Sequence, residues 1–144
     1  VVIIMTNDQI ILENDIKKIT INKKGDFIQI DMNDRETFDK LGETLQCFID
    51  KSKKISNDPD FKHVRELCEY GENQLKSIYG EDIVISIFGV KHPSIRAMTV
   101  FYLKLLKILS DFNNEVNSKT MDEIEKTYGS KYLDRSKIRE KIGN

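Results

Sequence analysis

The side chains that carry most enzymatic and metal chemistry are few in this chain: two histidines, His63 and His92, and two cysteines, Cys47 and Cys68. A structural zinc site needs several such ligands at short spacings, and neither histidine has a second His, Cys or carboxylate at ligand spacing. A cysteine nucleophile needs a histidine that a third group positions. His63 and Cys68 are five residues apart, which places them on different faces of a helix. We therefore predict that the protein is not an enzyme and holds no metal ion or cofactor.

A glycine-bracketed stretch, residues 79–94, is the second candidate for chemistry, because glycine-rich loops can bind phosphates. Such a loop needs clustered glycines followed by Lys-Ser or Lys-Thr. Gly80 and Gly89 are nine residues apart, and Lys91 is followed by a histidine. The stretch is therefore predicted to bind no nucleotide.

The same stretch fits a structural elbow between two helices. Gly80 stands where a helix C-cap glycine belongs, and Asp82 is suited to cap the element that follows. The apolar residues between the glycines share one helical face, which favours one to two turns of helix, although Ile and Val also favour a strand. Gly89 is expected to close this short helix, and Pro93 to open the next one.

The composition indicates one well-solvated domain with its own core. The chain has 144 residues, of which 39% are hydrophobic and 33% charged, and this length suits a single domain. Lys and Arg total 23 and Asp and Glu total 24, a balance that argues against a dedicated nucleic-acid-binding protein. No run approaches the roughly 18 apolar residues of a membrane span. Two cysteines are too few for a disulfide framework, so we predict reduced thiols and a cytoplasmic location.

The first 32 residues are predicted to form short strands. Residues 1–5 and 9–12 are β-branched apolar runs. Residues 17–22 and 27–32 alternate apolar and polar side chains with the period of half-buried strands. Gly25 lies in the turn between the last two segments, so a β-hairpin is expected over residues 17–32.

The apolar period becomes helical after residue 32. Asn33 and Glu36 form a capping-box pattern for a first helix, and Asp58 and Pro59 are suited to begin a second. Gly71 in the second helix costs about 1 kcal/mol relative to alanine, which predicts the close approach of a neighbouring helix. The expected apolar stripes are Phe38, Leu41, Leu45, Phe48, Ser52 and Ile55 in the first helix, and Phe61, Val64, Cys68, Gly71, Leu75 and Ile78 in the second.

The strongest helix is predicted to follow Ser94 and to form the centre of the core. The polar segment 117–123 is expected to break it, with Thr120 and Glu123 capping a separate short helix that ends at Gly129. Residues 131–144 are charged and basic, and they are predicted to be a final helix or to order only on a partner. The apolar stripe of the strong helix is Ile95, Met98, Phe101, Tyr102, Leu105, Leu106, Leu109, Phe112 and Val116.

These patterns predict an α+β protein that is predominantly α. N-terminal strands and a hairpin occupy residues 1–32, a helical core occupies 33–130, and a basic helix or tail occupies 131–144, all within one domain. The helical part is expected to be a bundle of about four to six helices.

The chain resembles the small tail-assembly chaperones of tailed phages and prophages of Gram-positive bacteria over roughly residues 16–142. IYGEDIVISIFG (78–89) is similar to their helix ending in aromatic-Gly-Glu and the short segment closing with aromatic-Gly, and IRAMTVFYLKLLKILSDFNNEV (95–116) to the long helix that follows. IQIDMNDRETFDKLGE (28–43) resembles their opening strand and first helix. YLDRSKIREKI (132–142) is similar to their basic tail but lacks its dense arginine run.

This resemblance implies a non-catalytic adaptor, encoded by a phage or prophage, in the cytoplasm of the bacterial host. Such chaperones associate with the tape-measure protein and help to recruit tail-tube subunits. The adaptor role is compatible with a homo-oligomer, and no membrane or nucleic-acid partner is expected. The long helix carries apolar residues over more than one face, which either complete the core or meet a partner's amphipathic helix. The expected partner surface is Phe101, Tyr102, Leu106, Arg135, Lys137 and Arg139.

Two other functions are also compatible with the sequence. The basic tail and helical body are compatible with a small DNA-associated regulator on a mobile element, although no helix-turn-helix with a basic recognition helix is evident. The N-terminal strands are compatible with a structural tail or capsid component that adds a strand to a neighbour's sheet.

Overall fold

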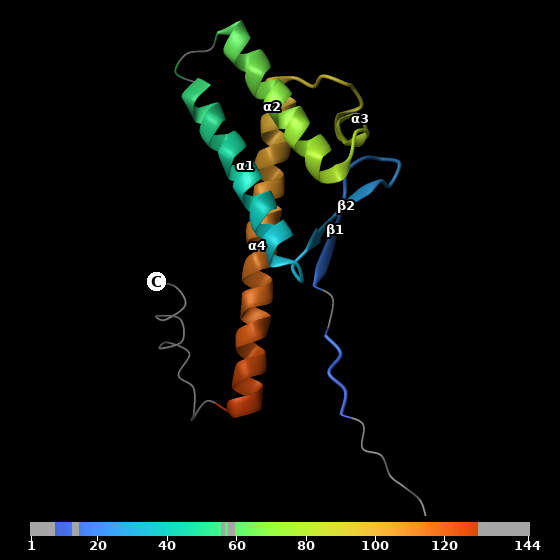
Figure 1. Cartoon of the computed structure of the whole chain (residues 1–144), viewed down its shortest axis with the longest axis vertical. Helices are drawn as coiled ribbons and strands as arrows, with labels where there is room; N and C mark the ends of the chain where they lie inside the picture. Colours follow the sequence, from blue (N-terminus) through green and yellow to red (C-terminus); the bar gives the residue numbers. More distant parts are fainter. Residues whose placement is uncertain (1–7, 13–14, 56, 58–59, 130–144) are drawn as a thin grey trace, which may run out of the picture.

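The computed structural model describes residues 8–12, 15–55, 57 and 60–129. Figure 1 shows a two-stranded hairpin beside a helical bundle, with α1 antiparallel to both α2 and α4. In the described part the protein is therefore α+β and mainly α, as predicted. The elements are β1 (Ile16–Thr20), β2 (Phe27–Asp31), α1 (Arg35–Ile55), α2 (Phe61–Tyr79), α3 (Ile83–Phe88) and α4 (Ile95–Tyr128).

The hairpin forms where alternation predicted it. β1 and β2 pair antiparallel, with Ile19 opposite Ile28. Ile28 and Ile30 are buried and cover one side of the helical core, which satisfies the apolar face that a lone hairpin cannot bury. The turn is joined to α3, because the side-chain amide of Asn22 donates to the carbonyl of Ser86 at 2.9 Å.

The strand predicted at residues 9–12 is wrong. Residues 8–12 are described, and they belong to no strand. Their aliphatic side chains are 81–90% exposed, and no described strand lies beside them to complete a ladder. High β-propensity cannot form a strand without a pairing partner. The strand predicted at residues 1–5 lies outside the described residues.

The first two helices begin one or more residues later than predicted. Asp34 caps α1 in place of Asn33, because its carboxylate accepts from the backbone N–H and the hydroxyl of Thr37. These hydrogen bonds lower the pKa of Asp34 from its ordinary value. Asp60 caps α2 by accepting from the N–H of Lys62 at 2.9 Å. The predicted start at Asp58 and Pro59 lies outside the described residues.

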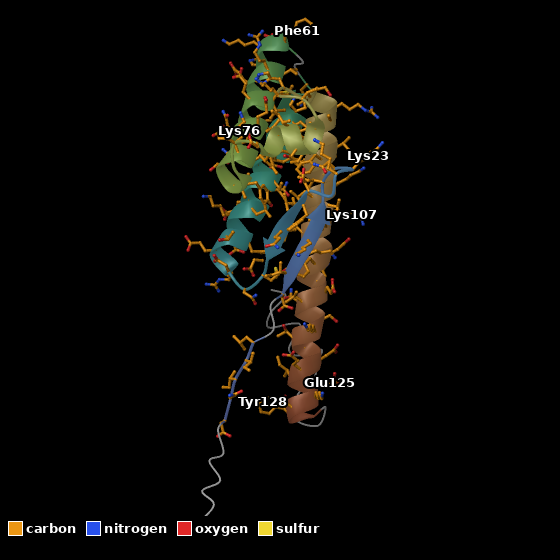
Figure 2. All side chains as sticks on the ribbon, turned by 90° about the vertical axis from the view of Figure 1, so that its right-hand side faces the viewer. Lys23, Phe61, Lys76, Lys107, Glu125 and Tyr128 are labelled. Atoms are coloured by element: carbon orange, nitrogen blue, oxygen red, sulfur yellow. The ribbon has the colours of Figure 1, made fainter. Side chains whose placement is uncertain are left out.

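The core lies where α1, α2 and α4 meet and is lined mainly by the predicted stripes. Ile49 and Leu67 are buried although they lie outside those stripes, and Val64 and Cys68 within them are only half-buried. Phe61 is 90% exposed, and Leu67 is buried in its place. Phe61 occupies the first position of α2, at the far end of the helix from the hairpin (Figure 2). The buried apolar residues are Ile28, Ile30, Leu41, Leu45, Phe48, Ile49, Leu67, Leu75, Ile83, Val84, Met98, Tyr102, Leu105, Leu109 and Phe112.

Gly71 is buried where α2 crosses its neighbours, as its position in the stripe predicted. A Cβ at this position would lie 2.8 Å from Cε2 of Phe48 in α1 and 3.1 Å from Sδ of Met98 in α4. Real Cβ atoms essentially never lie within 3.0 Å of another side chain, so Phe48 would have to shift, and the distance to Met98 is also tighter than most real contacts. The cost of glycine in a helix interior is therefore offset by the close packing of three helices.

α4 is one continuous helix of 34 residues, so the break predicted at residues 117–123 is wrong. This segment contains no glycine or proline, and Thr120 turns its hydroxyl back to the carbonyl of Val116 at 2.8 Å instead of capping a new helix. Gly129 ends α4. None of residues 113–128 is fully buried, and Figure 1 shows this half of α4 extending beyond the start of α1.

The elbow between α2 and α4 contains the short helix α3. The residues between Gly80 and Gly89 therefore form the predicted helix and not the alternative strand. Gly80 ends α2 at φ 103° and Gly89 ends α3 at φ 76°, conformations that other residues adopt only with strain. Asp82 makes no side-chain capping bond, so its predicted capping role is wrong. Its backbone is already helical at φ −88° and ψ −1°, whereas a capping residue is usually extended. Pro93 is buried beside Ser94, which caps α4.

Candidate functional site

The residues first considered for chemistry are the two histidines and the two cysteines, all of which the structure describes. Within the described ranges, no group of three or more His, Cys, Asp or Glu side chains is placed to hold a metal ion. Cys47 and Cys68 are both free thiols. Burial and the nearby carboxylates of Glu72 and Glu69 raise the pKa of Cys68, which disfavours the nucleophilic thiolate.

A buried carboxylate on α2 is the polar feature that sequence reasoning missed. Glu72 is 4% exposed, and its Oε1 lies 2.8 Å from Nδ1 of His92. The imidazole is open to solvent, since the His92 side chain is 81% exposed. The pair joins α2 to the loop between α3 and α4. No local sequence signal marks the burial of Glu72, because its partner lies twenty residues later in the chain.

This pair resembles the oriented histidine of a nucleophilic dyad but lacks the third member. Glu72 is the only hydrogen-bond partner that His92 has among the described residues. Nucleophilic catalysis requires a hydroxyl or thiol within hydrogen-bond reach of the base. The contact between Glu72 and His92 ties α2 to the loop between α3 and α4.

The described residues of the predicted partner surface do not lie together on the surface of the fold. Tyr102 is fully buried. Its ring stacks on Phe48 at 3.9 Å between centroids, and its hydroxyl donates to the carbonyl of Gly71 at 2.7 Å. Tyr102 is therefore core, and its placement on a partner surface is wrong.

Of the other predicted surface residues, the two that the structure describes lie at the margin of the core. Phe101 is half-buried, with its ring edge-on to Phe88 at 5.6 Å. Leu106 is also half-buried. Arg135, Lys137 and Arg139 lie outside the described residues.

A different line of α4 residues faces away from the core, and we name it the α4 seam: Arg96, Val100, Leu103 and Lys107. Their spacings of four, three and four residues place them in one row along the helix. Val100 is 40% exposed and Leu103 is 49% exposed. Figure 2 shows Lys107 on the side of α4 turned away from α1 and α2. The seam therefore has an apolar centre between two cationic ends.

The seam lies in an electropositive part of α4. Residues 95–107 contain Arg96, Lys104 and Lys107 and no acidic residue. Arg96 and Lys104 form no ion pair with any described residue, while Lys107 lies 3.5 Å from Asp111 in an exposed pair. The partial positive charge of a helix N-terminus adds to this field. Val100, Phe101 and Lys104 also border a shallow surface hollow with Arg96.

A second exposed apolar segment precedes the hairpin. Ile10, Ile11 and Leu12 are 81–90% exposed, and the last two border a hollow with Val116 and Lys119 on the projecting half of α4. Asp15 anchors the end of this segment through an ion pair with Lys119 at 3.2 Å. None of the described helices has the length and apolar character needed to cross a membrane.

The seam could have been found from the sequence. Val100 and Leu103 lie outside the core stripe that starts at Ile95, yet they are apolar and three residues apart. A second apolar pair on the opposite side of a helix, within a segment free of acidic residues, is the signal. The partner surface predicted for this helix, with Phe101, Tyr102 and Leu106, does not include this pair.

The chain was compared with known proteins. A family model matches residues 24–141, and its description is a family of unknown function (DUF6673). This range contains β2, the four described helices and the α4 seam. No curated protein and no solved structure matches the chain. By the extent of the family match, the chain belongs to the DUF6673 family.

Proposed function

We propose that this member of the DUF6673 family is a non-catalytic assembly chaperone that acts in phage tail morphogenesis. It binds the tape-measure protein and tail-tube protein in the cytoplasm of the bacterial host before these polymerise. The resemblance of residues 28–43, 78–89 and 95–116 to phage tail-assembly chaperones supports this role. It is absent from the finished tail.

One observation supports an adaptor most directly: α4 presents apolar side chains on the side that the bundle does not cover. The core is supplied by Met98, Leu105 and Leu109 on the inner face. Val100 and Leu103 are outside it, and 40% and 49% of their surface is exposed. Helical modules bind partner helices through such faces, and this use requires no reactive side chain.

Co-expression with the tape-measure protein of the same genome tests the proposal. The chaperone should keep the tape-measure protein soluble and co-purify with it. The Val100→Glu/Leu103→Glu variant should lose this effect, because it places charge at the centre of the exposed apolar pair. Lys62→Glu, an exposed substitution in the first turn of α2, serves as the control and should retain it. No capture by the wild-type protein would contradict the proposed function.

Two further measurements separate the alternatives. A salt-dependent mobility shift of duplex DNA by the pure protein would favour a DNA-associated regulator. Detection of the chain in finished tail particles would favour a structural component. In the described part each strand of the hairpin has one unpaired edge, the feature that strand addition would use.

A further inference from the structure

We propose that the α4 seam binds an acidic amphipathic helix of a partner protein. This inference rests on the proposed function, because it specifies the surface and the partner chemistry of the adaptor. Arg96, Val100, Leu103 and Lys107 form the row that the partner helix contacts.

The spacing of the seam suits a helix better than an irregular peptide. Residues at intervals of four, three and four recur on one side of a helix in the pattern of a coiled-coil row. A partner helix that carries two apolar side chains at the same spacing can lie beside Val100 and Leu103 along α4. The apolar centre is short, so the contact depends on the charges at both ends.

The charges of the seam and of Lys104 beside it specify an acidic partner. Arg96 and Lys104 have no carboxylate partner among the described residues. The contact between Lys107 and Asp111 joins two exposed side chains, 77% and 64% accessible, and pairs of this kind contribute little to stability. All three cations are thus available to carboxylates that flank the apolar residues of a partner helix.

The same charges disfavour a second copy of this chain as the occupant. An antiparallel pairing centred between Val100 and Leu103 brings Arg96 of one copy opposite Lys107 of the other. A parallel pairing brings each cation opposite itself. Like charges placed directly opposite each other destabilise a helix pair.

The chain's own C-terminal segment is disfavoured on the same ground. Residues 131–144 contain five basic residues and two acidic ones. This segment therefore repels the electropositive part of α4. A partner helix rich in Asp and Glu satisfies both the apolar centre and the cationic ends.

A pair of synthetic helices tests the inference with the full-length protein. The first peptide is about three heptads long, with leucine at the first and fourth heptad positions and glutamate at the flanking positions. The second has lysine in place of every glutamate. Fluorescence anisotropy with each labelled peptide should show binding of the glutamate helix at least tenfold tighter than the lysine helix, weakened by added salt because exposed charges are screened.

Variants in the seam and at Lys104 test whether these residues bind the peptide. Leu103→Glu should weaken binding of the glutamate helix by about tenfold or more, as expected when a central contact is lost. Arg96→Glu/Lys104→Glu should reverse the preference in favour of the lysine helix. Lys62→Glu should leave both affinities unchanged. Circular dichroism melts check that each variant stays folded, which the exposure of these positions predicts.

Each contrary result has a definite meaning. Equal binding of both peptides, or binding that Leu103→Glu does not weaken, overturns the inference. Dimerisation of the wild-type protein that Leu103→Glu abolishes overturns it in favour of a second copy, and duplex DNA binding that Arg96→Glu/Lys104→Glu abolishes overturns it in favour of nucleic acid. Capture of the tape-measure protein by the Arg96→Glu/Lys104→Glu variant overturns the inference but leaves the proposed function standing. Peptide binding without capture by the wild-type protein supports the inference and contradicts the proposed function.

Discussion

The hydroxyl of Tyr102 in α4 donates a 2.7 Å hydrogen bond to the backbone carbonyl of Gly71 in α2. The ring that carries this hydroxyl stacks on Phe48 of α1, so one side chain contacts both neighbouring helices. The contact depends on the missing Cβ of Gly71, because Phe48 and Met98 occupy the space that a side chain would need. The three long helices are thus held together at one crowded crossing.

The crossing predicts opposite effects for two glycine substitutions. Gly71→Ala should lower the free energy of unfolding by about 1–3 kcal/mol, because overpacking outweighs the gain in helix propensity. Gly42→Ala in α1 should raise it by up to about 1 kcal/mol, because its Cβ would lie 3.5 Å from Leu109, an ordinary contact. Chemical denaturation of both variants measures the difference. Stabilisation by Gly71→Ala would show that the helices do not approach as described.

Two tyrosines with buried hydroxyls should respond differently to the loss of that group. Tyr102→Phe removes a buried hydrogen bond and should cost about 1 kcal/mol. The hydroxyl of Tyr79 is also buried, but it has no hydrogen-bond partner among the described residues. Tyr79→Phe removes this unsatisfied group and should leave stability unchanged or raise it by about 1 kcal/mol. Urea denaturation at neutral pH compares the two variants, and an equal loss in both would contradict the assignment.

Tyr79 also predicts how stability depends on alkaline pH. Burial raises the pKa of Tyr79 from 10.0 to about 12, so the folded state retains the phenol proton after the unfolded chain has released it. The stabilisation from this group is therefore complete below pH 10 and lost as the pH rises toward 12. Tyr79→Phe should make the decline of the melting temperature over this interval less steep than in the wild-type protein. Parallel slopes would contradict the burial of this phenol.

The tie between Glu72 and His92 predicts an asymmetric response to mutation. His92→Ala leaves the Glu72 carboxylate buried without a partner and should cost about 1–3 kcal/mol. Adding Glu72→Gln to this variant should recover part of the loss, because a neutral amide is cheaper to bury than a charge. Lys91→Ala, a change at the exposed neighbouring residue, is the control and should have little effect. A null result for His92→Ala in thermal denaturation would indicate that the tie does not stabilise the elbow.

The sequence predicted those parts of the fold that follow from side-chain period. Ile28 and Ile30 alternate with polar neighbours and are buried, and Leu41, Leu45 and Phe48 repeat with the helical period and line the core. The close approach at Gly71 was also predictable, since a glycine within an apolar stripe weakens the helix unless a neighbouring helix needs the space. Each of these features can be predicted from one stretch of sequence, because the spacing of apolar residues within that stretch indicates which side chains are buried.

The features that could not be predicted depend on contacts between distant segments. Glu72 is buried because His92, twenty residues later, supplies a partner, and a carboxylate in a helix is otherwise expected to face solvent. The full burial of Tyr102 depends on the position of Phe48, which lies in another helix and stacks on the tyrosine ring. The adjacent Phe101 belongs to the same stripe but is only half-buried. The α4 seam is an intermediate case: Val100 and Leu103 are visible in the sequence as a second apolar pair, and only the fold shows that the bundle leaves them partly exposed.

Leucines on opposite sides of α4 should separate core from seam. Leu105 and Leu109 are 2% and 4% exposed, and truncation of either to alanine should cost about 2–5 kcal/mol through lost burial and a residual cavity. Leu103→Ala should cost much less, because Leu103 is 49% exposed. Equilibrium denaturation compares the three variants under one condition. A similar loss at Leu103 would place it in the core and remove it from the partner surface.

The continuity of α4 predicts that two hydroxyl residues respond in opposite directions to alanine. Ser94 caps the helix by accepting from the N–H of Ala97 at 3.1 Å, and Ser94→Ala should cost about 1 kcal/mol. Thr120 lies inside the helix and bonds back to Val116, so Thr120→Ala should be neutral or stabilising by up to about 0.7 kcal/mol through its higher helix propensity.

These two substitutions distinguish one helix from two. A Thr120 that capped a separate helix, as the polar segment 117–123 first suggested, would cost about as much to replace as Ser94. Hydrogen exchange gives an independent reading, because the amides of residues 117–121 are protected inside a continuous helix and exposed at a break. A loss of stability in Thr120→Ala together with fast exchange of these amides would mean that α4 ends before residue 117 in solution. Slow exchange with a neutral Thr120→Ala is the result that the back-bonded hydroxyl predicts.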